Sequence, residues 1–224
     1  MTQNNHLIKD IVYNAEGLIF DMDGTLLDSM GMWDNIDQIY LKQLNLDVPN
    51  NLKAEIEHLS FHKTAKYFKE RFNISDSVSK IEHDWYTMAL SIYKNKKMIK
   101  PYVKEFLSIV KSRKIKICLA TSNYMETART ALKTNKIYNF FDSISVTDEV
   151  EHDKDFPDVF ILSSKKLGIP PENCVVFEDS LPAIMSAKSA NMKVIAVKDS
   201  HSIHSLKSML KHCDAGISSF KELI

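Results

Sequence analysis

From Pro101 to the C-terminus, short apolar runs of strand length alternate with segments whose apolar residues recur every three or four positions. This alternation predicts β-strands joined by α-helices. Strands connected through helices run parallel, with helices on both faces of the sheet. We therefore expect the α/β class and a doubly wound, Rossmann-like parallel sheet. Strands are expected at 116–120, 143–146, 174–177 and 193–197, helices at 103–111, 125–134, 158–167 and 182–190, and a final pair of elements at 206–210 and 215–217.

A long helical stretch interrupts this alternation after the first strand, which is expected at 17–20. From Met30 to Met98 the apolar spacing is helical, with breaks near Pro49 and at 73–76, and this predicts four helices without a strand. We therefore expect an α/β core formed by residues 1–28 and 98–224, and an all-helical domain formed by residues 29–97 and inserted after the first strand.

Charge and composition exclude several classes of function. The chain has 29 Lys and Arg against 29 Asp and Glu, so its formal net charge is zero and no overall field attracts nucleic acid or an anionic membrane. Its five glycines form neither a dinucleotide-binding fingerprint nor a P-loop. No apolar run approaches the roughly 18 to 20 residues that cross a bilayer.

The cysteines and the first residues indicate where the protein acts. The three cysteines are odd in number and far apart, as is typical of reduced thiols. The first six residues are polar and lack the apolar segment of a secretion signal. We expect a cytoplasmic monomer that binds a small metabolite, with neither nucleic acid nor membrane as a partner.

Polar side chains follow several of the expected strands at the point where each strand ends. In an open parallel sheet, ligands bind at the carboxyl ends of the strands, so we expect these side chains to meet at one edge. They are Asp21, Asp23 and Thr25 after the first strand, Thr121, Ser122 and Asn123 after the second, Lys154 after the third, and Glu178 and Asp179 after the fourth.

The chemistry of this set points to a metal and a phosphoryl group. Facing carboxylates repel one another unless a cation lies among them, and Mg²⁺ prefers oxygen ligands. Lys154 offers a positive charge, Thr121 offers a hydroxyl, and the backbone of the turn at 22–25 offers N–H groups to phosphate oxygens. Positioning and charge neutralisation are what phosphoryl transfer requires.

Four stretches together resemble the signature of the haloacid dehalogenase superfamily, in its phosphatase and β-phosphoglucomutase-like branch with a helical cap. The resemblance covers the chain from about Gly17 to the C-terminus, and the helical insertion lies where this family places its mobile cap. The matching stretches are Asp21-Met22-Asp23-Gly24-Thr25, Leu119-Ala120-Thr121-Ser122-Asn123, Lys154 with Pro157-Asp158-Val159-Phe160, and Val175-Val176-Phe177-Glu178-Asp179.

The resemblance implies a role for each matched residue. Asp21 would be the nucleophile that forms an aspartyl-phosphate, and Asp23 would act first as acid and then as base. The metal ligands would be Asp21, Asp179 and the carbonyl of Asp23, with Glu178 contributing directly or through water. The phosphoryl group would be held by Met22, Gly24, Thr25, Thr121, Ser122 and Lys154.

The helical insertion offers weaker candidates for substrate recognition, namely Trp33, His62 and Lys63, together with Asn123 from the core. An apolar stripe on a helix is more often packing than a binding surface. Two departures from the family pattern also bear on the site: Asp155 follows Lys154 where the family often has Pro, and Asn191 stands where it usually has Gly. Asn can take the left-handed conformation that such a helix end requires.

These features predict a magnesium-dependent phosphatase that hydrolyses a small phosphomonoester, similar to a sugar phosphate. The alternative is a sugar phosphomutase, in which a bound sugar instead of water attacks the aspartyl-phosphate. Mutase relatives carry an Arg-Leu-Lys-Gly stretch in the cap, and residues 57–62 lack its Arg and Gly. A remote alternative is an inactive binding module, which the acids at Asp21 and Asp23 argue against.

Overall fold

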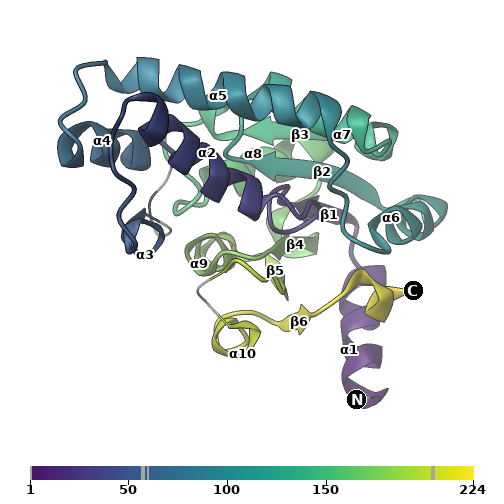
Figure 1. Ribbon diagram of the computed structural model, residues 1–224. Helices are drawn as coiled ribbons and strands as arrows, with labels where there is room; N and C mark the ends of the chain where they lie inside the picture. The colour runs from purple at the N-terminus through teal and green to yellow at the C-terminus, as the bar shows by residue number, and fades with distance from the viewer. Residues whose placement is uncertain (1, 57–58, 60, 203–204) are drawn as a thin grey trace.

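The computed structural model describes residues 2–56, 59, 61–202 and 205–224. Six parallel strands form one sheet in the order β3-β2-β1-β4-β5-β6 (Figure 1). This arrangement confirms the α/β class and the doubly wound parallel sheet. The strands are β1 (Gly17–Phe20), β2 (Lys116–Thr121), β3 (Ser143–Val146), β4 (Cys174–Glu178), β5 (Lys193–Val197) and β6 (Ala215–Ile217).

Strand β1 lies in the middle of the sheet, and its register aligns the strand ends that matter for the site. Phe20, the last residue of β1, is paired with Leu119 of β2 and with Phe177 of β4. The residues that follow Phe20 and Phe177 therefore lie side by side at the carboxyl edge. Strand β2 continues two residues beyond Leu119, to Thr121.

Helices cover both faces of the sheet because successive side chains of a strand point to opposite faces. Leu18 and Phe20 belong to one apolar cluster, and Ile19 between them belongs to the other. The flanking helices are α1 (Thr2–Tyr13), α6 (Val103–Ser112), α7 (Met125–Thr134), α8 (Asp158–Leu167), α9 (Leu181–Ser189) and α10 (Leu206–Met209).

Between β1 and α6 the described chain is helical, as expected. Figure 1 shows α2, α4 and α5 gathered together on one side of the sheet. Their shared interior is aromatic: the Trp85 ring lies 5.7 Å from the Tyr40 ring and 4.9 Å from the Phe68 ring, and all three side chains are buried. The four helices, called the cap from here on, are α2 (Met30–Gln43), α3 (Leu52–Ile56), α4 (Phe61–Arg71) and α5 (Val78–Asn95).

Among the described residues, the structure adds one α-helix that the sequence did not predict, α1. Ile8 and Val12 lie one helical turn apart and are both buried, whereas the polar residues before them gave no apolar pattern. Tyr13 donates a hydrogen bond to the carbonyl of Leu223, so α1 is held against the C-terminal segment (Figure 1).

The expected left-handed conformation is present at Asn191, whose φ is 62°. Among the described residues, no helix has the length and apolar character needed to cross a membrane.

Candidate active site

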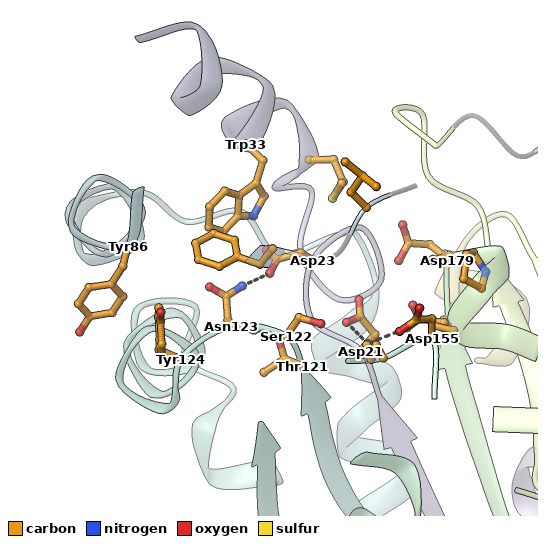
Figure 2. Close-up of a pocket in the computed structure, with 18 residues that line it drawn as sticks. Asp21, Asp23, Trp33, Tyr86, Thr121, Ser122, Asn123, Tyr124, Asp155 and Asp179 are labelled. Atoms are coloured by element: carbon orange, nitrogen blue, oxygen red, sulfur yellow. Dashed lines mark hydrogen bonds and ion pairs between the residues drawn. The ribbon is translucent and has the colours of Figure 1, made fainter. Parts of the chain in front are cut away.

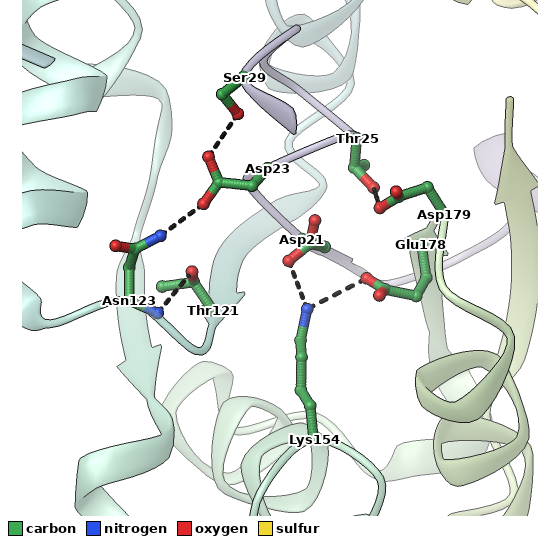
Figure 3. Close-up of polar contacts among 9 residues, drawn as sticks. All are labelled: Asp21, Asp23, Thr25, Ser29, Thr121, Asn123, Lys154, Glu178 and Asp179. Atoms are coloured by element: carbon green, nitrogen blue, oxygen red, sulfur yellow. Dashed lines mark hydrogen bonds and ion pairs between the residues drawn. The ribbon is translucent and has the colours of Figure 1, made fainter. Parts of the chain in front are cut away.

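Asp21, Glu178 and Lys154 form the centre of a buried polar cluster at the carboxyl edge of the sheet (Figure 3). Asp21 directly follows β1, and its backbone N–H donates to the carbonyl of Phe177 at 3.0 Å, which fixes it against β4. The Lys154 ammonium donates to Asp21 Oδ1 and, at 3.1 Å, to Glu178 Oε2. Lys154 therefore points into the acidic cluster although Asp155 follows it.

Asp179 completes the cluster from the residue after β4. Its Oδ1 accepts a hydrogen bond from the Thr25 hydroxyl at 3.0 Å. The turn at residues 22–25 requires glycine at position 24. Gly24 has φ of 82°, and a Cβ there would lie 2.2 Å from Asp179 Oδ2. The glycine of the first motif thus allows the backbone to approach this carboxylate.

Asp23 faces the cap instead of the acidic cluster. Its Oδ1 accepts a hydrogen bond from the Ser29 hydroxyl, and its Oδ2 accepts one from the side-chain amide of Asn123 (Figure 3). Oδ1 also accepts a hydrogen bond from the Tyr93 hydroxyl. Tyr93 lies on α5 and is fully buried. One cap helix therefore contributes directly to the position of this carboxylate.

Thr121 and Asn123 are tied together at the end of β2. The backbone N–H of Asn123 donates to Thr121 Oγ1 at 3.1 Å, and the Thr121 side chain is buried next to the cavity. Ser122 lies between them and also lines the cavity. The second motif therefore supplies two hydroxyls and an amide to the same edge of the sheet.

Burial and repulsion between carboxylates raise the pKa values of Asp179, Glu178 and Asp23, which favours their protonated forms. Burial, together with the charge of Asp21, raises the pKa of Asp179 to about 8 and raises the pKa of Glu178 well above its ordinary value. Burial and the Asp21 carboxylate also raise the pKa of Asp23 to about 6, against hydrogen bonds from Ser29 and Tyr93 that lower it. Burial lowers the pKa of Lys154, but the charges of Asp21 and Glu178 outweigh burial and raise it above its ordinary value.

This cluster fits a hard divalent cation. One carboxylate oxygen from each of Asp21, Glu178 and Asp179 lies within 4.8 Å of the others, and all three residues are buried. Asp21 Oδ2 is buried and has no hydrogen-bond partner among the described residues. A buried carboxylate oxygen without a donor is costly unless a cation meets it. The all-oxygen donor set and the excess of negative charge suit Mg²⁺.

The cluster opens into a cavity of about 270 Å³ between the sheet edge and the cap (Figure 2). The edge of the sheet contributes most of the polar residues, and the cap contributes mainly apolar and aromatic ones. The described lining residues are Asp21, Asp23, Met30, Trp33, Leu59, Phe61, Tyr86, Thr121, Ser122, Asn123, Tyr124, Lys154, Asp155, Glu178, Asp179, Ser180, Pro182 and Ala183.

The site residues expected from the sequence are placed unevenly around this cavity. Trp33 of the cap lines it, but two other cap candidates do not: His62 pairs with Glu82 at 2.9 Å, and Lys63 pairs with Asp155 at 3.1 Å. Met22, Gly24 and Thr25 belong to the turn behind Asp21, and the side chains of Met22 and Thr25 are fully buried. Met22, Gly24 and Thr25 can therefore reach a ligand only through their backbone groups, whereas the side chain of Asp23 lines the cavity.

Sequence reasoning missed several residues of the site. Tyr93 and Ser29 hold Asp23, and Phe61, Tyr86 and Tyr124 line the cavity. Ser29 was available as a signal because it lies six residues after Asp23. The four aromatic residues lie in helical stripes or beside a helix start, where packing is the usual explanation.

Comparison with known proteins gives consistent results. A family model described as "Haloacid dehalogenase-like hydrolase" matches residues 18–197. The phosphorylated carbohydrates phosphatase of Thermotoga maritima is 28% identical over 180 residues, which are 80% of this chain and 83% of that protein. A probable pseudouridine-5'-phosphatase of Drosophila melanogaster is 27% identical over 189 residues, 81% of this chain and 80% of that one. The crystal structure of a putative beta-phosphoglucomutase from Thermotoga maritima superposes with a TM-score of 0.74 at 27% identity, covering 93% of this chain and 96% of that chain.

Proposed function

The chain belongs to the haloacid dehalogenase-like hydrolase family, and we propose that it is a magnesium-dependent phosphatase that hydrolyses a small phosphomonoester through an aspartyl-phosphate. The observation that carries this proposal is the set of contacts around Asp21. An ammonium lies on Oδ1, the buried Oδ2 has no hydrogen-bond partner in the described part of the chain, and two further carboxylates lie within 4.8 Å. The relatives are named as a phosphorylated carbohydrates phosphatase and a probable pseudouridine-5'-phosphatase, which supports hydrolysis of a small phosphate ester.

In the first step, an oxygen of Asp21 attacks phosphorus and the bond from phosphorus to the leaving alcohol oxygen breaks. Asp23 donates its proton to that oxygen, so the alcohol leaves neutral. In the second step, Asp23 takes a proton from water, whose oxygen attacks phosphorus and releases phosphate and the Asp21 carboxylate. A carboxyl group with a pKa of about 6 exchanges a proton readily in both directions.

Other residues of the edge bind the phosphoryl group and the metal. Lys154 offsets the negative charge of the phosphoryl group, and the Thr121 hydroxyl donates a hydrogen bond to one of its oxygens. Ser122 and the backbone N–H groups of the 22–25 turn lie beside them. Mg²⁺ would be held by Asp21, Glu178 and Asp179 with the carbonyl of Asp23. When bound, it supplies charge neutralisation for the transferred group.

The cap helices are proposed to form a domain of residues 29–97 over a core of residues 1–28 and 98–224, closing over the cavity when substrate binds. The cavity of about 270 Å³ supports a small substrate. Small phosphoesters should therefore be hydrolysed, and efficient hydrolysis of a large phosphoprotein would contradict this role of the cap.

The mutase alternative needs a site for a second phosphate, and the cavity does not favour it. Lys154 is the one basic residue among the described residues that line the cavity. His58 and Ser60, in the stretch that mutases mark with Arg and Gly, lie outside the described residues. We therefore propose water, not a bound sugar, as the acceptor.

We also propose a monomer in the reducing cytoplasm. The three cysteines are free, and two of them, Cys118 and Cys174, are buried in strands of the sheet. A reducing compartment suits thiols that are not paired.

The experiment that tests the proposal is phosphate release from p-nitrophenyl phosphate with and without Mg²⁺. Activity should fall to background in EDTA and return when Mg²⁺ is added in excess. A panel of phosphorylated metabolites, assayed with and without a bisphosphorylated sugar, then separates hydrolysis from isomerisation. Full activity in EDTA, or isomerised sugar as the main product, would contradict the proposal.

Tyr93→Phe tests how the cap positions Asp23. This change removes one hydrogen bond to the Asp23 carboxylate and preserves the ring that packs in the cap. Because a hydrogen bond to a charged group contributes roughly 1.5–3 kcal/mol, we expect kcat to fall by about tenfold or more, with little change in KM. An unchanged kcat would show that Ser29 and Asn123 suffice to hold Asp23.

A further inference from the structure

The cavity has two chemically different ends. Figure 2 shows Asp21, Asp155 and Asp179 on one side of Asn123, and Tyr86 and Tyr124 on the other. The acidic side is where the proposed reaction takes place. The other side must accept the alcohol that leaves, so its composition bears on the substrate.

The far end is an aromatic wall, made of Trp33, Phe61, Tyr86 and Tyr124. The Phe61 ring lies 5.8 Å from the Trp33 ring and 6.2 Å from the Tyr124 ring, and Tyr124 lies 5.0 Å from Tyr86. Each of these pairs meets edge to face, so the four rings support one another in a continuous series.

Contacts outside the cavity hold the rings of the wall in place. The Phe61 ring is 5.6 Å from the buried Trp85 ring of the cap interior. The Tyr86 hydroxyl donates to Glu126 Oε2 at 2.5 Å, which joins cap helix α5 to core helix α7. Rings held in this way lose little freedom when a ligand packs on them, so binding to the wall is preorganised.

The described residues of the wall include no basic side chain that could pair with a second anion. Among the described lining residues Lys154 is the one cation, and its ammonium is already engaged by Asp21 and Glu178. The faces of aromatic rings carry negative potential and do not attract anions. An open-chain polyol gains less from the ring faces of the wall, because it has no flat apolar surface to stack on them.

We propose that the alcohol released by this enzyme carries a flat, uncharged aromatic ring that stacks on the wall. This inference rests on the proposed phosphatase reaction and narrows its substrate class to phosphomonoesters of ring-bearing primary alcohols, such as nucleoside 5'-monophosphates. The phosphate lies at Asp21, a linking segment passes Asn123, and the ring contacts Phe61, Tyr86 and Tyr124.

The test compares uridine 5'-monophosphate with ribose 5-phosphate, which share the reacting phosphate and primary alcohol oxygen and differ by the base. Stacking of one base on aromatic side chains is worth roughly 1–3 kcal/mol, so we expect kcat/KM for the nucleotide to be about tenfold higher or more. The difference should lie mainly in KM, because the reacting groups are the same.

Two variants assign the preference to the wall. Tyr86→Ala removes a partly exposed ring, and Phe61→Leu removes a ring but keeps apolar volume, so that the cap still packs. Each should reduce the ratio of the two kcat/KM values at least about threefold. The control is Ile39→Ala, an exposed apolar residue of α2 outside the cavity, which should leave the ratio unchanged.

The possible failures are distinguishable. A wild-type ratio at or below one, or an unchanged ratio in both wall variants, overturns the inference and leaves the phosphatase intact. If neither compound nor p-nitrophenyl phosphate releases phosphate in the presence of Mg²⁺, the proposed function is overturned and the inference with it.

Discussion

Asp21→Asn should lower kcat for p-nitrophenyl phosphate by about 10⁴-fold or more, the range seen when a catalytic nucleophile is removed. The amide preserves the shape of the side chain and can still accept a hydrogen bond from Lys154, but it lacks the charge needed to attack phosphorus. The measurement is steady-state phosphate release at saturating Mg²⁺.

The control for this prediction is Asp47→Asn, an acid-to-amide change at an exposed position of the cap side. Its kcat should stay within about twofold of the wild type. Thermal unfolding of both variants shows whether they are folded. Retention of most of the activity in folded Asp21→Asn would exclude Asp21 as the nucleophile.

Lys154→Met should have two large effects that appear in different experiments. The ammonium contacts both Asp21 and Glu178 in a buried cluster, and it is proposed to offset the charge of the transferred group. Loss of one such electrostatic contact lowers kcat by about 10²–10³-fold. Without the ammonium, the metal-free protein retains two buried carboxylates with less compensation, which destabilises it by about 3–5 kcal/mol.

Mg²⁺ should recover stability in this variant but not activity. A cation bound among the acids replaces part of the missing charge, so Mg²⁺ should raise the unfolding midpoint of Lys154→Met more than that of the wild type. The control is Lys166→Met on α8, away from the cavity. This change removes an ammonium that pairs with Glu149 at 2.7 Å. Equal midpoint shifts in wild type and Lys154→Met would contradict a metal among these acids.

The convergence of the polar motifs was predictable because it follows from the order of the elements. Asp21, Thr121 and Glu178 stand at the ends of β1, β2 and β4, and parallel strands bring such ends to one edge. The direction of the Lys154 side chain was harder to predict, because the loop that carries this residue is irregular. Its direction depends on where the acids already lie.

The contribution of the cap could not be predicted in the same way. Tyr93 lies 70 residues from Asp23, and on a helix its spacing is that of an ordinary core residue. The cap face depends on how helices pack, and helix packing follows the shapes of side chains more than any periodic pattern. The sequence therefore suggested Trp33, but the helical spacing alone could not show that Trp33 lines the cavity while its neighbour Met32 is buried in the core.

Helix α1 shows a similar limit at the other end of the molecule. Its apolar face is short, and its partner is the segment Phe220–Leu223 at the far end of the chain. Contacts between distant segments stabilise a helix that local propensity alone leaves marginal.

The most direct test of the account is to look for phosphate on Asp21. Wild-type protein is mixed with ³²P-labelled substrate and Mg²⁺, quenched in acid within milliseconds, and digested for peptide mapping. We predict a burst of labelled protein approaching one phosphate per chain, with the label on the peptide that contains Asp21 and none in Asp21→Asn. Rapid hydrolysis without labelled protein, or a label on another residue, would contradict the account.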